Sequence, residues 1–253
     1  MELGETTPPP GGFVISGAAT SVQYTLRTIT YIDGFNLYFG CLKSLPHCRW
    51  LDVWELAQAI CKANNPASEL TLVRYFTAPI GARLSKRGSA SVKAQQDYLR
   101  ALSIYQPNVD IIQGKFFYAE GQYHENIKPL DLDTKVSVIR AEEKQTDVNI
   151  AVHMMADAAD GLCDQQVLIS NDSDCAPALA MIRKRHPDIV RGVIAPLPNI
   201  QLGSKGRRRP SNELTDLSSW TRESISEDLL TNCQLPNRIP TRKRPIDKPA
   251  HWR

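Results

Sequence analysis

The chain has 253 residues, of which 42% are hydrophobic and 23% charged, and its formal net charge is +3. This composition is ordinary for a globular domain with its own core, and it excludes fibrous and low-complexity chains. No apolar run approaches the ~20 residues that span a bilayer. Glu2 and Glu5 stand where a secretory signal peptide carries basic residues. We therefore expect a cytoplasmic protein without a membrane partner.

The positive charge is concentrated toward the C-terminus. Residues 203–253 hold 11 Lys+Arg against 6 Asp+Glu, whereas the preceding residues hold 19 against 21. This asymmetry predicts a basic appendage on a mildly acidic body. The six cysteines include no Cys-x-x-Cys pair, so we expect buried free thiols and no structural zinc site.

Taken in chain order, the sequence predicts strands that alternate with helices. The Pro-, Gly-, Ser- and Thr-rich segment 1–24 is expected to be a disordered lead-in. The β-branched and aromatic run at 28–33 predicts the first strand. Further strands are predicted at 70–76, 109–113, 167–169 and 190–195, and helices at 37–42, 51–63, 93–102, 147–159, from 176 onward, and at 214–230.

Three stretches follow this pattern less clearly. Residues 116–132 alternate weakly and predict a hairpin or strand excursion, while 136–143 fits no single element and 142–146 resembles a loop that approaches the next helix. In the helix predicted at 147–159, one face is lined by the apolar residues Val148, Ala151, Val152, Met155, Ala158 and Ala159. The Pro- and Arg-rich segment 235–253 is expected to be a disordered tail.

Alternating strands and helices predict an α/β fold with a mostly parallel sheet. Right-handed crossovers place the carboxyl ends of all strands along one edge, where ligand sites of open α/β sheets lie. Asp33 ends the first strand, and Asp172 and Asp174 follow the apolar run at 167–169. Asp147 opens a helix and is expected to face the same edge. Capping of the helix by Ser173 or Asp174, and a turn at Asp33, remain alternatives for these residues.

Four carboxylates in one cleft repel one another. At ~5 Å and an effective dielectric constant near 20, each pair costs roughly 3 kcal/mol. Such a cluster persists by holding protons or cations, and oxygen ligands suit Mg²⁺ or Mn²⁺. Asn36, Ser170 and Ser173 are candidates to orient a carboxylate or a water molecule, with turn or cap hydrogen bonding as the alternative.

Three motifs together resemble those of NYN domains in the PIN/FLAP-like nuclease superfamily. They are Tyr-Ile-Asp-Gly-Phe-Asn at 31–36, Lys-Gln-Thr-Asp-Val at 144–148, and Ser-Asn-Asp-Ser-Asp at 170–174. The resemblance implies a PIN-like three-layer sandwich over residues 25–232, followed by a basic, Pro-rich tail at 233–253. It also implies a metal-dependent ribonuclease with Asp33, Asp147, Asp172 and Asp174 in the acidic metal-site positions and Asn36 as the supporting amide. The family often has a glycine and an apolar residue before the middle aspartate, where this chain has Gln145 and Thr146.

Basic and polar residues near the motifs are candidates to bind substrate phosphates. They are Ser170, Ser173, Lys144, Arg207, Arg208 and Arg209, with Arg83, Lys86, Arg87 and Lys205 in predicted loops. Glu143 is a candidate fifth acid, although a solvated charge beside Lys144 is favoured. The expected partner is RNA, and single-stranded DNA and a homo-oligomeric state are left open.

Two other functions compete with the ribonuclease. A non-catalytic module that binds RNA or a nucleotide would keep the same acidic pocket. Some similar chains are called pyridine-ring hydroxylases, but this sequence has no Gly-x-Gly-x-x-Gly fingerprint and no two-His–one-carboxylate pattern. His153, on the helix after Asp147, is expected to be a surface or packing residue.

Overall fold

The computed structural model describes residues 24–83, 85–129, 131–198 and 209–252, so the expected lead-in at 1–24 lies almost entirely outside the described residues. A six-stranded sheet forms the centre of the molecule, with the order β3-β2-β1-β6-β7-β8 and every neighbouring pair parallel. Its strands are β1 Leu26–Asp33, β2 Ser68–Thr77, β3 Val109–Gln113, β6 Gln165–Ile169, β7 Val190–Ile194 and β8 Trp220–Arg222. The predicted α/β class and parallel sheet are confirmed.

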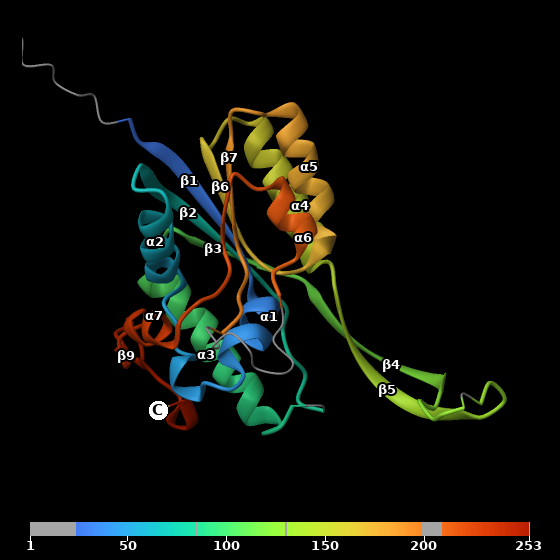
Figure 1. Cartoon of the computed structure of the whole chain (residues 1–253). Helices are drawn as coiled ribbons and strands as arrows, with labels where there is room; N and C mark the ends of the chain where they lie inside the picture. The colour runs from blue at the N-terminus through green and yellow to red at the C-terminus, as the bar shows by residue number, and fades with distance from the viewer. Residues whose placement is uncertain (1–23, 84, 130, 199–208, 253) are drawn as a thin grey trace, which may run out of the picture.

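Helices cover both faces of this sheet, giving three layers (Figure 1). On one side lie α1 Gly34–Leu37, which continues as a π-helix at Tyr38–Leu42, and α2 Val53–Asn64, α3 Ser89–Tyr105 and α7 Glu227–Asn232. On the other side lie α4 Thr146–Ala159, α5 Ala176–Arg185 and α6 Asn212–Leu217. Two strands, β4 Lys115–His124 and β5 Lys135–Lys144, form a separate antiparallel ribbon.

Strand β1 shows why the sheet is buried on both faces. Its side chains alternate between the two cores: Tyr31 packs with the α4 and α5 residues, and Ile32 packs with those of α2 and α3. Both are fully buried, as expected for a central parallel strand. The six cysteines are buried and free, as predicted.

The helix predicted at 214–230 is wrong. The segment divides into α6, the edge strand β8 and α7. Trp220 and Thr221 favour extended backbone, and they pair with β7 because that strand would otherwise be an open edge. A new helix then begins at Ser226, whose Oγ accepts a hydrogen bond from the Leu229 amide at 3.3 Å.

The disordered tail expected at 235–253 is also wrong, because residues 235–252 pack on the body. Leu235, Ile239 and Ile246 are each at most 3% exposed. Ile239 and Ile246 face each other across the short strands β9 Arg238–Ile239 and β10 Ile246–Asp247. The Trp252 ring lies 6.2 Å from Trp50, at the end of a 3-10 helix at Ala250–Trp252. Widely spaced apolar side chains therefore anchor a segment whose average composition resembles that of disordered chains.

Helix α4 buries only part of the face expected from its apolar spacing, since Ala158 is 4% exposed and Met155 packs against the core, but the start of that face is open to solvent. Val148 and Val152 are 65% and 58% exposed, whereas Ile150, Met154 and Asp157 are buried. On the buried face, the carboxylate of Asp157 accepts two hydrogen bonds from Arg74 on β2, from Nε at 2.8 Å and from Nη2 at 2.7 Å. This ion pair joins the buried face of the helix to the sheet.

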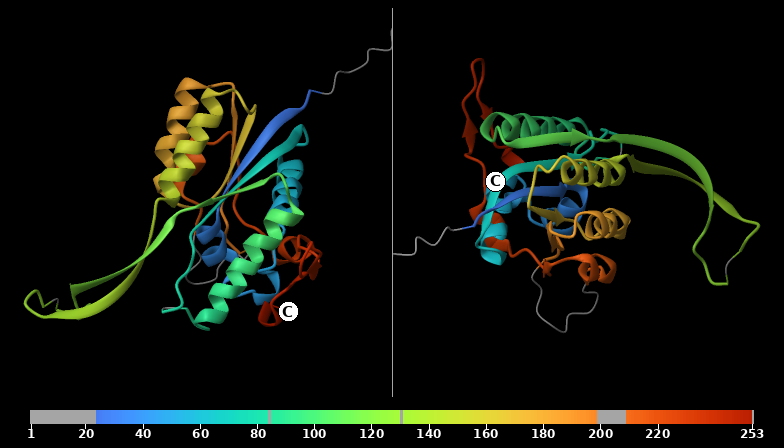
Figure 2. Two further views of the ribbon diagram at one scale, coloured as in Figure 1. Left: turned by 180° about the vertical axis from the view of Figure 1, so that it is seen from behind. Right: turned by 90° about the horizontal axis from the view of Figure 1, so that it is seen from above.

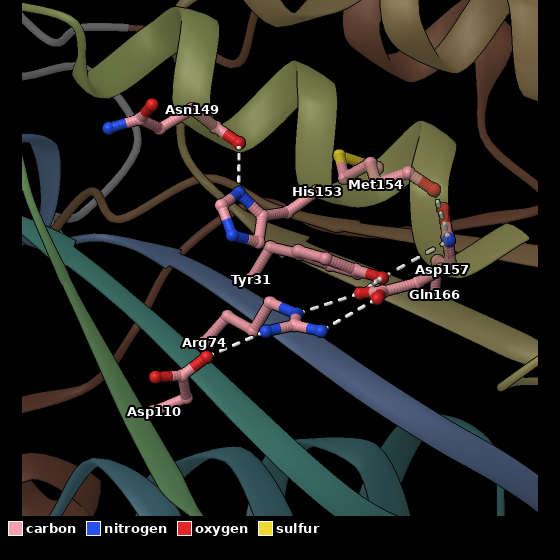
Figure 3. A network of polar contacts seen from close by, with 8 residues as sticks. All are labelled: Tyr31, Arg74, Asp110, Asn149, His153, Met154, Asp157 and Gln166. Carbon is pink, nitrogen blue, oxygen red and sulfur yellow. Dashed lines mark hydrogen bonds and ion pairs between the residues drawn. The ribbon is translucent and has the colours of Figure 1, made fainter.

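A polar network extends from this ion pair across three strands (Figure 3). Tyr31 on β1 donates its hydroxyl proton to Asp157 Oδ2 at 2.7 Å, and Arg74 Nη1 reaches Asp110 on β3 at 2.6 Å. Gln166 on β6 donates to the Tyr31 hydroxyl at 3.2 Å and to the Met154 carbonyl at 2.8 Å. Helix α4 is thereby fixed against β1, β2 and β6 at once.

Replacing Arg74 with methionine is predicted to destabilise the fold by about 3–5 kcal/mol, because Asp157 would remain buried without its cation. Urea unfolding measures this change. The control is Arg27→Met, which breaks a surface ion pair with Asp164 whose two side chains are 51% and 29% exposed. The control should cost much less, because water already screens this exposed pair. Equal losses in the two variants would contradict the proposed role of Arg74.

Candidate active site

The carboxyl end of β1 places Asp33 almost out of contact with solvent. The residue is 4% exposed and begins α1. Its Oδ1 accepts a hydrogen bond from the backbone N–H of Asn36 at 2.9 Å, and its Oδ2 accepts one from Ser170 Oγ at 3.0 Å. Gly34 lets the backbone lie close to β2 here, since a Cβ would stand 2.6 Å from the Phe76 carbonyl oxygen. Asp33 is therefore held in one orientation by groups from two neighbouring strands.

The carboxyl end of β6 lies directly beside it. Ser170 is fully buried, and besides donating to Asp33 its Oγ accepts the Asp172 amide at 3.1 Å. Asn36 Oδ1 accepts the Asn171 amide at 3.1 Å. Side chains after one strand thus bond the backbone after the other, and the two motifs form one rim.

Asp172 combines a structural role with its place on this rim. It precedes the 3-10 helix at Ser173–Cys175, and its Oδ1 accepts the Asp174 amide at 3.1 Å. The capping alternative for Ser173 or Asp174 is wrong, because Asp172 supplies the cap and α5 has no side-chain cap. Asp174 is exposed and borders a shallow hollow of about 570 Å³ between α5 and α6.

Asp147 reaches the rim from the first turn of α4. The residue two positions earlier, Gln145, has φ of 80°, a left-handed conformation that glycine adopts with less strain. This is the position at which the family often has glycine. Thr146 is buried, and its hydroxyl donates to Glu143 Oε1. The approach loop predicted at 142–146 is thus the last part of β5 followed by one tight turn.

The acids of the rim act on one another electrostatically. Burial raises the pKa of Asp33 to about 6, aided by the charges of Asp172 and Glu143 and opposed by its two hydrogen bonds. Burial also raises the pKa of Asp147 to about 6, and the further causes are Asp33, Asp172, Glu143 and Asp174. The buried Cys175 thiol has its pKa raised by burial and then by the four aspartates of the group. Carboxylates from three separate elements therefore influence one another's ionisation.

Glu143 belongs to this group, although the sequence favoured a solvated charge. It is half-buried and acts on both Asp33 and Asp147. Lys144 instead pairs with Glu142, with Nζ 2.8 Å from Oε2. The alternation of β5 explains the difference, because it turns residue 143 toward the body and residues 142 and 144 to the opposite face.

Sequence reasoning missed an aromatic rim beside the acids. The Phe35 ring stacks on Phe39 at 6.2 Å and contacts Phe116 at 5.7 Å, and Phe39 is 55% exposed. The Lys43 ammonium lies 5.1 Å from the centre of the Phe39 ring. In the ribbon, Phe116 is paired with Glu143, so the rings adjoin the acidic group. The signal was the i, i+4 spacing of Phe35, inside the first motif, and Phe39, three residues after it.

The remaining predicted residues lie at different distances from the rim. Arg209 is exposed, but its carbonyl accepts a hydrogen bond from Asn171 Nδ2 at 3.1 Å, so its backbone lies at the rim. Arg207, Arg208 and Lys205 lie outside the described residues. Arg83 pairs with Glu120 at 3.4 Å. His153 packs edge-on against Phe76, and its Nδ1 lies 2.8 Å from the Asn149 carbonyl.

Two features are absent from the described residues. No group of three or more His, Cys, Asp or Glu side chains stands in the arrangement of a metal site there. In the same residues, no helix combines the length and the apolar character needed to cross a bilayer.

Comparison with known proteins decides the family. The model of the NYN domain matches residues 27–199, a span that contains all three motifs and both strand ends described above. The chain belongs to the NYN domain family. NYN domains are part of the PIN-like nuclease superfamily, which agrees with the resemblance seen in the sequence.

Two individual proteins are also similar to this NYN chain. The 6-hydroxy-3-succinoylpyridine 3-monooxygenase HspA of Pseudomonas putida is 35% identical over 250 residues, covering 90% of this chain and 75% of that protein. A crystal structure of a Vibrio parahaemolyticus protein of unknown function aligns with a TM-score of 0.41 and 15% identity, over 81% of this chain and 96% of that one.

Replacing Asp147 with asparagine is predicted to stabilise the protein at pH 7.5 in the presence of a chelator. With its pKa raised to about 6, folded Asp147 holds a proton that the unfolded chain releases near 4, so stability falls as pH rises through this window. Asparagine removes that cost. After allowance for screening at a half-exposed site, the gain is about 1 kcal/mol.

The measurement is urea unfolding of parent and variant at pH 4.5 and pH 7.5. The gain should shrink strongly at the lower pH. Asp188→Asn, an exposed aspartate in the loop before β7, is the control and should show no pH-dependent gain. If Asp147→Asn raised the free energy of unfolding equally at both pH values, the raised pKa of Asp147 would be contradicted.

Proposed function

We propose that this NYN protein is a ribonuclease that hydrolyses RNA phosphodiester bonds with Mg²⁺ or Mn²⁺. The observation that carries the proposal is the convergence of Asp33, Asp147 and Asp172, from three elements, at the carboxyl edge of the parallel sheet. Two of them have a pKa raised to about 6. Membership of a nuclease superfamily supports the same reading of these acids.

The types of donor atom at the rim suit a divalent cation, although the described side chains do not stand in the arrangement of a metal site without one. Carboxylate oxygens are the ligands that Mg²⁺ and Mn²⁺ prefer, and a cation would offset the repulsion that raises the two pKa values. Asp33, Asp147, Asp172 and Asp174 are the residues that would hold it. When bound, such an ion lowers the pKa of a water ligand and neutralises charge on phosphate oxygens.

The chain's own residues supply orientation. The Ser170 hydroxyl and the backbone N–H of Asn36 each donate a hydrogen bond to one oxygen of Asp33, which keeps this carboxylate from rotating. Asn36 Oδ1 already accepts the Asn171 amide, so its Nδ2 group is the part of the side chain that offers hydrogen-bond donors to a substrate. Since Asp33 and Asp147 must be ionised to bind a cation, activity at subsaturating cation should rise with pH through about 6, and this rise should move to lower pH as the cation concentration increases.

The aromatic rim points to single strands as the substrate. Bases stack on exposed aromatic side chains only when they are not already stacked in a duplex, and such stacking contributes about 1–3 kcal/mol per base. Phe39, with a ring more than half exposed and Lys43 above it, offers a base and its phosphate a place next to the acids. Ser173, Lys144, Arg207, Arg208 and Arg209 remain candidates for phosphate contacts.

A second candidate rests on a specific observation, the name of the Pseudomonas putida relative. By that name the relative hydroxylates a pyridine ring, and the identity extends over most of this chain. A monooxygenase needs an external reductant and a site that activates oxygen. At the rim, the described side chains offer carboxylate, amide and hydroxyl groups, a donor set that suits phosphate hydrolysis with a hard cation better than redox chemistry.

The deciding experiment incubates the purified protein with single-stranded and duplex RNA in Mg²⁺, in Mn²⁺ and in EDTA. We predict cleavage of single strands that EDTA stops. Asp172→Asn keeps the oxygen that caps the 3-10 helix, yet it should slow cleavage by more than about 100-fold, since even indirect partners of a metal are worth about 10- to 100-fold. Asp188→Asn is the matched control and should cleave like the parent.

Three outcomes would overturn the proposal. Cleavage by Asp172→Asn at the parental rate would reject the site. RNA binding that is indifferent to EDTA, without cleavage of any strand, would indicate a non-catalytic module. NADH oxidation that depends on a hydroxypyridine would establish the second candidate.

A further inference from the structure

A small hairpin of the C-terminal segment stands beside helix α3. In the right view of Figure 2, the red hairpin of β9 and β10 rises next to the green helix, and α3 contacts both short strands. Between the hairpin and the helix lies a hollow of about 490 Å³. We call it the basic hollow. Its lining comes from the second half of α3 and from the turn between β9 and β10: Arg100, Ile104, Thr241, Arg242, Lys243 and Arg244.

The turn that forms one wall of the basic hollow is held in place by its own contacts. Thr241 Oγ1 donates a hydrogen bond to the Arg244 carbonyl at 2.7 Å and accepts one from the backbone N–H of Lys243 at 3.2 Å, a local pattern that closes turns. On either side of the turn, Ile239 and Ile246 pair across the two strands and are at most 3% exposed. The cations of the turn are therefore presented by a hydrogen-bonded loop with an apolar base.

The positive charge of the basic hollow is not compensated. All four Lys and Arg side chains of its lining are exposed, and in the described parts of the chain none of them pairs with an acid. The acids nearest to them in sequence are already engaged, because Asp97 lies 2.5 Å from Lys93 and Asp247 lies 3.8 Å from Arg238. A concave surface with charges of one sign concentrates the opposite charge from solution.

Another run of cations, at the end of α5, has a local explanation that the basic hollow lacks. Arg183, Lys184 and Arg185 occupy the last turn of α5, where the helix dipole stabilises positive charge. The last turn of α3 carries no basic residue, and Arg100 lies before it. The other cations of the hollow come from a separate segment of the chain. A helix terminus therefore does not account for this cluster.

Positive charge also continues from the basic hollow toward the acidic rim. Helix α3 spans about 25 Å and begins at Ser89, after β2 has ended at the carboxyl edge of the sheet. Arg87 precedes the helix at this end. Burial lowers the pKa of His251, and the charges of Arg87 and Arg49 lower it further, so both cations lie near the C-terminal segment. A strand that continues from the rim along α3 therefore meets cations at both ends of the helix.

The lining of the basic hollow favours a nucleic-acid backbone over other polyanions. Ile104 is the one apolar side chain among the described lining residues, whereas protein interfaces have an apolar core. A bilayer surface is flat on this scale and does not enter a concave site. Guanidinium and ammonium groups bind phosphates without reading bases, so they add affinity without sequence preference.

We infer that the basic hollow is a second RNA-binding site, in which four cations contact the phosphates of a strand that extends from the acidic rim along α3. These cations are Arg100, Arg242, Lys243 and Arg244. The inference rests on the proposed function, because the strand is the substrate of the acidic rim. The hollow contributes affinity and takes no part in the reaction, since its residues lie far along α3 from the carboxyl edge of the sheet.

Binding of a labelled single-stranded RNA of about 20 nucleotides, longer than a single binding site, tests the inference. Fluorescence anisotropy in EDTA, over a range of salt concentrations, measures affinity without cleavage. Arg100→Gln/Lys243→Gln should weaken binding by about 10-fold or more at ~0.1 M salt. The slope of log K against log salt should become shallower by about 1.4, because each phosphate contact to a single strand contributes about 0.7.

The matched control is Lys184→Gln/Arg185→Gln, which removes one Lys and one Arg from α5 on the opposite side of the sheet. It should keep the parental affinity and salt slope. Arg100→Lys/Lys243→Arg keeps both charges in the hollow and should also bind like the parent. Far-UV circular dichroism and thermal unfolding establish that each variant is folded.

Strand length and turnover separate this site from the acidic rim. A strand of about four nucleotides is too short to occupy both sites, so Arg100→Gln/Lys243→Gln should bind it like the parent. With the long strand and Mg²⁺, the same variant should raise KM and leave kcat unchanged, whereas Asp172→Asn should lower kcat. A parent that binds RNA through the hollow but cleaves none would reject the proposed function and leave the second site in place.

The inference would be overturned by an equal loss of affinity in the two glutamine pairs, or by an unchanged salt slope in Arg100→Gln/Lys243→Gln. Equal weakening for the short and the long strand would also contradict it. If this variant kept its RNA affinity but no longer bound vesicles of phosphatidylserine and phosphatidylcholine, the hollow would belong to a membrane surface and the RNA site would be rejected.

Discussion

The structure depends on one buried ion pair, between Arg74 in the middle of a central strand and Asp157 in helix α4. A guanidinium and a carboxylate removed from water are costly unless they pair well, and here the pairing is bidentate with Tyr31 as a third donor. The pairing of Asp157 with Arg74 holds one face of α4 against the sheet. It therefore helps to place the first turn of the helix, with Asp147, relative to the ends of β1 and β6.

This placement has an energetic cost that the fold tolerates. Asp33 and Asp147 are held where burial and neighbouring acids disfavour their ionised forms. Gln145 adopts a left-handed conformation so that the chain can turn from β5 into α4. Such departures from the most stable arrangement are common at functional sites, where groups are positioned for a ligand and not for the isolated protein. The same positioning leaves Val148 and Val152 in solvent.

Much of the architecture followed from local patterns. The sequence predicts β1 from its β-branched and aromatic residues, and β6 from an apolar run that ends in small polar residues, and it predicts β2, β3 and β7 as well. These strand ends located Asp33 and Asp172 at one edge without any knowledge of distances. What they did not supply was orientation. The buried face of α4 is joined to the sheet by Arg74 and Asp157, which are 83 residues apart in the chain.

The other failures share a physical cause. Averages over composition missed the C-terminal segment, because a few residues such as Leu235 and Ile246 are enough to dock it. Helical spacing suggested one helix where Trp220 completes the edge of the sheet. Glu143 resembled a surface charge because its neighbours are charged, although strand alternation turns it inward. In each case a tertiary contact overrides a local preference.

The central claim is that acids from distant parts of the chain share one site that a divalent cation neutralises. Carbon-13 NMR of the aspartate carboxyl groups, titrated with and without Mg²⁺, tests it most directly. We predict that the pKa values of Asp33 and Asp147 are near 6 without the cation and fall clearly when it is added. Values near 4 for both groups, unchanged by Mg²⁺, would contradict the claim.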